Sequence, residues 1–259
     1  MKTVRNAGLS LSFVAIFVLA VVGQSLAGYT YNNEELARHG RPLVTYLDFV
    51  TSSEFLVDIA ENWQSEFLQF FLFILATIWL IQRGSSESKK PGDEGLGTDE
   101  DQFVGAYARE DSPAWAKVRG LRLWLYSNSL LITMGAIFLL SWFAQSLAGH
   151  VVANEENAQH GLPPESWIEY VFSAEFWNRT LQNWQSEFLA VGAMVAFAIY
   201  LRQRGSSESK PVGAPHHVSS VESEYPDVSH SVRGSACVRV IDSATTPTPG
   251  RLVRAARRC

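Results

Sequence analysis

The sequence predicts an all-α membrane protein with four transmembrane helices, arranged as two tandem-duplicated helical hairpins of parallel orientation, with short interfacial helices. Three observations lead to this fold class. Several strings recur letter for letter at one constant spacing, apolar residues are concentrated in four runs, and most lysines and arginines near these runs lie on one side of them.

The recurrence indicates an internal duplication. Asn-Trp-Gln-Ser-Glu-Phe-Leu stands at residues 62–68 and 183–189, and Gln-Arg-Gly-Ser-Ser-Glu-Ser-Lys stands at 82–89 and 203–210. Both strings recur at an offset of 121 residues (183 − 62 and 203 − 82), as does Gln-Ser-Leu-Ala-Gly, which begins at Gln24 and Gln145. A register kept without insertion is typical of a tandem repeat.

The repeat divides the chain into four parts. We expect a first two-span unit over residues 1–84, a polar, acidic cytoplasmic linker over 85–118, a second two-span unit over 119–210 and a disordered tail over 211–259. The linker and tail lack the apolar content that a packed core needs.

The apolar runs have the length of membrane spans. Residues 9–28 and 123–149 each provide the roughly 20 residues that cross a bilayer core. A secretory signal peptide is the alternative for the first run, but the same Gln-Ser-Leu-Ala-Gly closes the third run, deep inside the chain, which favours an uncleaved helix. The second span, ending near Gln82, and the fourth, ending near Leu201, reach full length only if they begin near Trp63 and Trp184.

Lysine and arginine set the expected orientation. They are numerous beside the N-terminus, the linker and the string at 203–210, and sparse in the segments between the paired spans. Since cytoplasmic loops carry the excess of these residues, both termini and the linker should be cytoplasmic. In the outer segments we expect Asn33 to cap a short helix that ends at Gly40, and a second helix to begin near Ser53.

Polar residues inside the predicted spans are the main candidate site. Gln24 and Glu66 should lie at matching depth on neighbouring antiparallel helices, about one turn inside the outer ends, where their side chains could form a hydrogen bond. The second unit repeats this arrangement, and an asparagine lies one turn further out in each unit. The full cluster is Gln24, Asn62, Glu66, Gln145, Asn183 and Glu187. Such groups either bind helices together or form a ligand or proton site.

A second candidate is a metal site in the outer segments. Glu35 with His39, and Glu156 with His160, stand four residues apart and could share a metal ion. The alternative is a histidine in the last turn of a short helix, stabilised by the helix dipole and by the glutamate.

The sequence carries no recognised catalytic constellation, so we expect a protein that is not an enzyme and that uses no cofactor. Nucleic-acid binding has no support, because no basic face with interleaved aromatic residues is present. Both cysteines, Cys237 and Cys259, lie in the tail, outside the predicted spans.

Taken together, these strings resemble a family of uncharacterised bacterial integral membrane proteins that is classed as a domain of unknown function. The resemblance covers roughly residues 5–215. It implies a multi-pass protein of the bacterial inner membrane and assigns no catalytic residue. We expect a structural or scaffold-type envelope component, whose partners are the lipid bilayer and a further copy of itself in a homo-oligomer. The alternative is a small transporter or channel with a polar path lined by the repeated Gln/Glu pairs.

Overall fold

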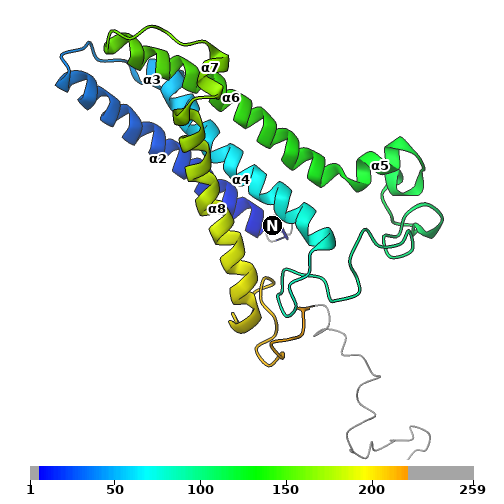
Figure 1. Cartoon of the computed structure of the whole chain (residues 1–259). Coiled ribbons are helices and arrows are strands. Elements are labelled where there is room, and N and C mark those ends of the chain that lie inside the picture. The colour runs from blue at the N-terminus through cyan, green and yellow to red at the C-terminus, as the bar shows by residue number, and fades with distance from the viewer. Residues whose placement is uncertain (1–5, 221–259) are drawn as a thin grey trace, which may run out of the picture. The chain divides into compact units, whose positions relative to one another are not determined.

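The computed structural model describes residues 6–220, and within this range all regular secondary structure is helical (Figure 1). The expected disordered tail from 221 onward and the basic residues Lys2 and Arg5 lie outside the described residues. The elements are α2 (Gly8–Arg38), α3 (Tyr46–Val50), α4 (Ser53–Trp79), the 3₁₀ helices η1 (Gly105–Tyr107) and η2 (Ala114–Lys117), α5 (Leu121–Ser127), α6 (Ser129–Gln159), α7 (Trp167–Val171) and α8 (Ala174–Tyr200).

Three helices of the first unit correspond to three of the second. Helices α2 and α6, α3 and α7, and α4 and α8 each begin and end at positions 121 residues apart. Residues related by this offset are called counterparts below.

Capping side chains explain why the short helices form where they do. The hydroxyl of Thr45 accepts from the backbone N–H of Asp48, whose carboxylate accepts from the backbone of Thr45; Ser166 and Glu169 do the same before α7. Ser52 and its counterpart Ser173 cap α4 and α8 in turn. Each hydroxyl satisfies an amide that the first turn leaves without an intrahelical partner.

The serine and the glycine of the two Gln-Ser-Leu-Ala-Gly strings have the same structural role in both units. The hydroxyl of Ser25 lies 2.8 Å from the Tyr46 hydroxyl, and its counterpart Ser146 accepts from Trp167 Nε1 at 3.1 Å. One turn later a glycine makes room for an aromatic ring of the short helix, Phe49 over Gly28 and Tyr170 over Gly149. Serine and glycine therefore fasten α3 to α2 and α7 to α6.

Two expectations about the outer segments need correction. Helix α2 does not stop near Gly28 and restart at Asn33, but runs on to Arg38, because nothing in this stretch breaks the helix before Gly40 takes φ +66°. The side chain of Asn33 therefore does not cap a helix. It holds the next turn by accepting from the N–H of Val44 and donating to its carbonyl, and Asn154 does the same at Glu165.

Further differences concern the linker and the third apolar run. That run is not one helix, since α5 ends at Ser127 and α6 begins after Asn128. The linker contains the 3₁₀ helices η1 and η2. The stretch 211–220, expected to be disordered, forms turns that surround Lys210.

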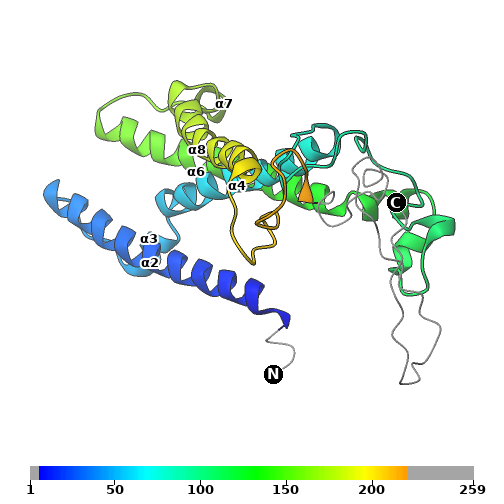
Figure 2. The ribbon, with the colours of Figure 1, turned by 90° about the horizontal axis from the view of Figure 1, so that it is seen from below.

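The helices of the described part pack unevenly. Helix α4 lies along α6, and α8 crosses α4 (Figure 1). Helix α2 lies to one side of these three in Figure 2, and Ser25 is its one buried residue. The aromatic core sits at the α6–α7–α8 junction, where Tyr170 and Phe176 are fully buried against Trp142 and Trp177.

Two helices, α2 and α6, are long and apolar enough to cross a membrane. Helices α4 and α8 are each 27 residues long but contain no stretch of span length as apolar as those of α2 and α6. Their first halves carry the polar strings that contain Gln64 and Gln185, which lower the average.

Candidate functional site

Polar side chains of three helices meet at one level of the structure. They comprise Asp58, Glu61 and Gln64 of α4, Gln145 of α6, and Arg179, Thr180 and Trp184 of α8; we call these seven residues the three-helix polar cluster.

The cluster is connected by interhelical contacts. The Arg179 guanidinium pairs with the Glu61 carboxylate and, at 3.6 Å, with that of Asp58. Trp184 Nε1 donates to Gln64 Oε1 at 2.8 Å, and Gln145 Nε2 donates to Thr180 Oγ1 at 3.3 Å. Every bond in this set joins two different helices. The cluster therefore fixes α4, α6 and α8 against one another.

The centre of the cluster is closed to solvent. Gln64, Gln145 and Thr180 have no exposed surface, and the Glu61 side chain is 12% exposed. Two of the buried amides are only half satisfied, because Gln64 Nε2 and Gln145 Oε1 have no hydrogen-bond partner among the described residues. Buried amide groups left in this state each cost about 1–3 kcal/mol.

The ionisable groups show the effect of burial and pairing. The Glu61 side chain is largely buried beside the Arg179 guanidinium, whereas the Asp58 side chain is half exposed. The Arg179 side chain is 29% exposed and pairs with both carboxylates. The guanidinium thus stays charged beside the two carboxyl groups.

More carboxyl groups lie around this centre. Glu54 and Glu175 are exposed, and other acidic side chains lie near them: Asp58 and Glu155 near Glu54, and Glu156 near Glu175. Burial raises the pKa of Tyr170 to about 12, and its hydroxyl has no hydrogen-bond partner in the described part of the chain. Negative charge therefore exceeds positive charge at this end of the helices.

The central ion pair joins two counterparts. Asp58 and Arg179 are 121 positions apart, so one position carries opposite charges in the two units. Glu54 and Glu175 are also counterparts, and both keep the acid. Helices α4 and α8 cross (Figure 1), and the side chains of Asp58 and Arg179 meet between them.

The structure brings together only part of the site that the sequence predicts. Gln145 belongs to the three-helix polar cluster. Asn62 and Asn183 instead donate to carbonyls of their own helices, those of Asp58 and Arg179. Gln24 is partly buried and forms no hydrogen bond with Glu66 within residues 6–220; the residue of α2 that lies against this part of α4 is Phe17, which contacts Trp63.

The two glutamates of the recurrent string lie outside the bonded network. Glu66 is exposed and Glu187 is partly exposed, and neither has a hydrogen bond or ion pair to another described residue. The two carboxylates are close enough to repel each other. They are counterparts too, so they come from corresponding positions of α4 and α8, as Asp58 and Arg179 do.

The suggested metal pairs stay separate. His39 Nδ1 lies 2.9 Å from the carbonyl oxygen of Glu35 and 3.8 Å from its carboxylate, while that carboxylate also pairs with Arg38. His160 Nδ1 lies 2.9 Å from the carbonyl of Glu156. No group of three or more potential metal ligands occurs within residues 6–220. Each histidine thus closes the last turn of its helix.

Several residues of the three-helix polar cluster are missing from the sequence prediction. Glu61, Arg179 and Thr180 lie shortly before the recurrent string, where the sequences of the two units differ, so the repeat does not point to them. The signal that could have found them is the complementary charge at Asp58 and Arg179.

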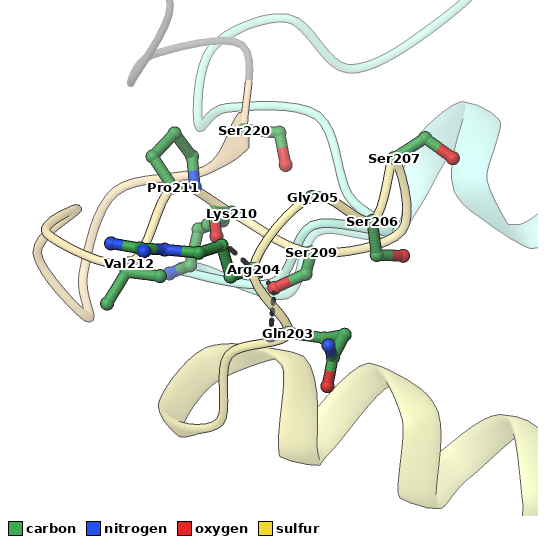
Figure 3. Close-up of a pocket in the computed structure, with 10 residues that line it drawn as sticks. All are labelled: Gln203, Arg204, Gly205, Ser206, Ser207, Ser209, Lys210, Pro211, Val212 and Ser220. Carbon is green, nitrogen blue, oxygen red and sulfur yellow. Dashed lines mark hydrogen bonds between the residues drawn. The ribbon is translucent and has the colours of Figure 1, made fainter.

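The segment that follows α8 forms a separate pocket of about 600 Å³ (Figure 3). Its lining includes the side chains of Arg204, Ser206 and Lys210. Lys210 is buried, and its ammonium donates to the carbonyls of His216, at 3.2 Å, and Val218, at 2.8 Å. Lys210 also bonds to the Gly84 carbonyl, which links the two recurrent serine-rich loops.

Over residues 6–220, the fold and the site define an all-helical structure with two candidate membrane-spanning helices and a polar cluster that connects three helices. The chain belongs to the family described as a domain of unknown function (DUF6766), whose model matches residues 1–221. This agrees with the resemblance to an uncharacterised family. No curated protein and no solved structure matches the chain.

Proposed function

We propose that this protein is a four-span component of the bacterial inner membrane, with both termini in the cytoplasm, and that it acts as a structural scaffold instead of an enzyme. The observation that carries the proposal is the three-helix polar cluster. Its hydrogen bonds and ion pairs run between helices, so polar groups that would be costly in hydrocarbon serve to hold the bundle together.

Four spans are supported by the correspondence between the two units. Helices α4 and α8 have the length of a span, since 27 residues at about 1.5 Å each exceed the roughly 30 Å of a bilayer core. Their polar first halves are tolerated if they face the cluster, while the apolar second halves face lipid. The tandem duplication then places both hairpins in the same orientation.

A topology measurement tests the four spans. Single cysteines are placed, in a chain without Cys237 and Cys259, at four exposed positions: Arg41, Gln102, Gln159 and Ser207. We expect an impermeant maleimide to label Arg41→Cys and Gln159→Cys in intact cells. Gln102→Cys and Ser207→Cys should react only after permeabilisation. Labelling of Arg41→Cys and Gln102→Cys from the same side would exclude α4 as a span.

The alternative function, a small transporter or channel, is supported by one observation. Glu66 and Glu187 repel each other and are not bonded to other described residues, and charged groups in membranes often line an ion or proton path. Scaffolding needs no such pair.

Proteoliposomes decide between the two functions. The wild-type chain and the Glu66→Gln plus Glu187→Gln variant are reconstituted, and proton and potassium fluxes are measured. A scaffold should show no flux above that of empty liposomes. Flux through the wild-type chain that disappears in the variant would overturn the scaffold proposal and support the channel.

The same variant provides a stability control. Because Glu66 and Glu187 repel each other and lack partners, we expect its Tm in detergent to be equal to or above that of the wild-type protein. A lower Tm would mean that the two carboxylates bind the helices together through contacts absent from this structure.

A further inference from the structure

The contact between α6 and α4 contains a size-matched pair. A Cβ atom at Gly135 of α6 would lie 3.0 Å from the ring of Phe71 of α4, so the ring occupies the space that the glycine leaves. A few turns along, Gln145 of α6 reaches the carboxylate of Glu61 on α4. The α6–α4 contact is therefore complementary in side-chain size at Gly135 and Phe71, and in polarity at Gln145 and Glu61.

The counterparts of these four residues, which lie on α2 and α8, are also complementary to each other in size and polarity. Gly135 and Phe71 correspond to Val14 of α2 and Gly192 of α8, so the large and the small residue have changed sides. Gln145 and Glu61 correspond to Gln24 and Gln182, two amides that can bond to each other. A contact between α2 and α8 with the same geometry as that between α6 and α4 would therefore be complementary at both levels.

The structure leaves this second contact unmade. Helix α2 does not pack along α8, and a Cβ atom at Gly192 would have no neighbour within 4 Å. Ala60 and Leu68 of α4 are buried, whereas their counterparts on α8, Leu181 and Leu189, are 50% and 71% exposed. The face of α8 that corresponds to the packed face of α4 is uncovered.

The chain's own α2 is held elsewhere. Asn32 donates to Glu54 at 2.6 Å, Ser25 bonds to Tyr46, and the ring of Phe17 lies 6.2 Å from that of Trp63. These contacts fasten α2 beside α3 and α4. They leave the matching face of α2 open, since Val14 is 57% exposed.

We propose that two copies of the chain pair by placing α2 of each copy against α8 of the other. Val14 of one copy then fills the space above Gly192 of its partner, and Gln24 bonds to the partner's Gln182. The exchange is reciprocal, so it forms a closed two-fold dimer with no unmatched face. It also removes both amides from hydrocarbon, which favours association inside a bilayer.

Cross-linking in membranes tests this pairing. In a chain whose Cys237 and Cys259 are serine, one tagged copy carries Val14→Cys and a differently tagged copy carries Gly192→Cys. The two are co-expressed and oxidised. We expect a disulfide-linked dimer that carries both tags, at a yield several-fold above that of either variant expressed alone.

Matched controls keep the result interpretable. Ala190→Cys lies on another face of α8, so its pairing with Val14→Cys should give little dimer. Phe71→Cys with Gly135→Cys in one chain should cross-link at monomer size and shows that oxidation works. Gly192→Leu should reduce dimer formation, measured by energy transfer between labelled copies, while Ala190→Leu should not.

Two outcomes would overturn the pairing. One is a Val14→Cys plus Gly192→Cys chain that cross-links only within itself, which would mean that α2 closes over its own α8. The other is the absence of any cross-link while the Phe71→Cys and Gly135→Cys control succeeds. Neither outcome bears on the flux measurement, so failure here is separate from failure of the scaffold proposal.

Discussion

Replacing Arg179 by aspartate should cause the largest loss of stability of any single change in the three-helix polar cluster. The variant removes the partner of Glu61 and Asp58 and places a third carboxylate beside them. Hydrogen bonds to charged groups contribute about 1.5–3 kcal/mol each, and leaving a buried charge unpaired adds to the loss. Because Asp58 is half exposed, we expect a loss of about 2–4 kcal/mol, or a Tm lower by about 5–10 °C.

The counterpart relation offers a stringent control. Asp58→Arg combined with Arg179→Asp exchanges the two charges across the crossing of α4 and α8, so most of the lost Tm should return. Asp58→Asn alone should cost little, because that side chain is half exposed and the pair distance is 3.6 Å. If the double exchange is no more stable than Arg179→Asp, the ion pair does not hold the two helices together.

Gly149→Ala should give the second-largest effect. The added methyl group would collide with the hydroxyl of Tyr170 and lie 2.9 Å from its Cζ atom. Tyr170 is fully buried against Phe176, so its rigid ring has no room to move. Overpacking of this kind costs about 1–3 kcal/mol, which thermal unfolding in detergent would detect.

Two comparison variants isolate the collision. Gly23→Ala meets nothing within 4 Å in α2, and its Tm should stay level or rise, since alanine favours helix by about 1 kcal/mol over glycine. Tyr170→Phe, which reproduces the Gly28–Phe49 pair of the first unit, should recover part of the stability lost in Gly149→Ala. An undiminished Tm for Gly149→Ala would show that α7 is not fixed to α6 at this point.

The sequence predicts the helical class and much of the local order. The start of α4 at Ser53 is confirmed, and the constant offset of 121 residues recurs in the bounds of α2 and α6. These features depend on local capping and on apolar length, which a sequence shows directly.

The partners of polar groups could not be predicted in the same way. Depth along a span places Gln24 and Glu66 at one level, but it does not say which helices pack together. The structure pairs α4 with α6, helices of different units, so Gln145 meets Glu61 and Thr180 instead of Glu187. That choice depends on side-chain size and charge across an interface, which periodicity within one helix does not contain.

The opposite charges at Asp58 and Arg179 have a consequence for how the two halves of the chain would assemble if they were separate polypeptides. If each half were made as a separate polypeptide, two first halves would bring two acids together and two second halves would bring two guanidinium groups together. Only a mixed pair would be neutral. Joining both halves in one polypeptide sets their stoichiometry at one to one, so neither half is left to assemble with its own kind.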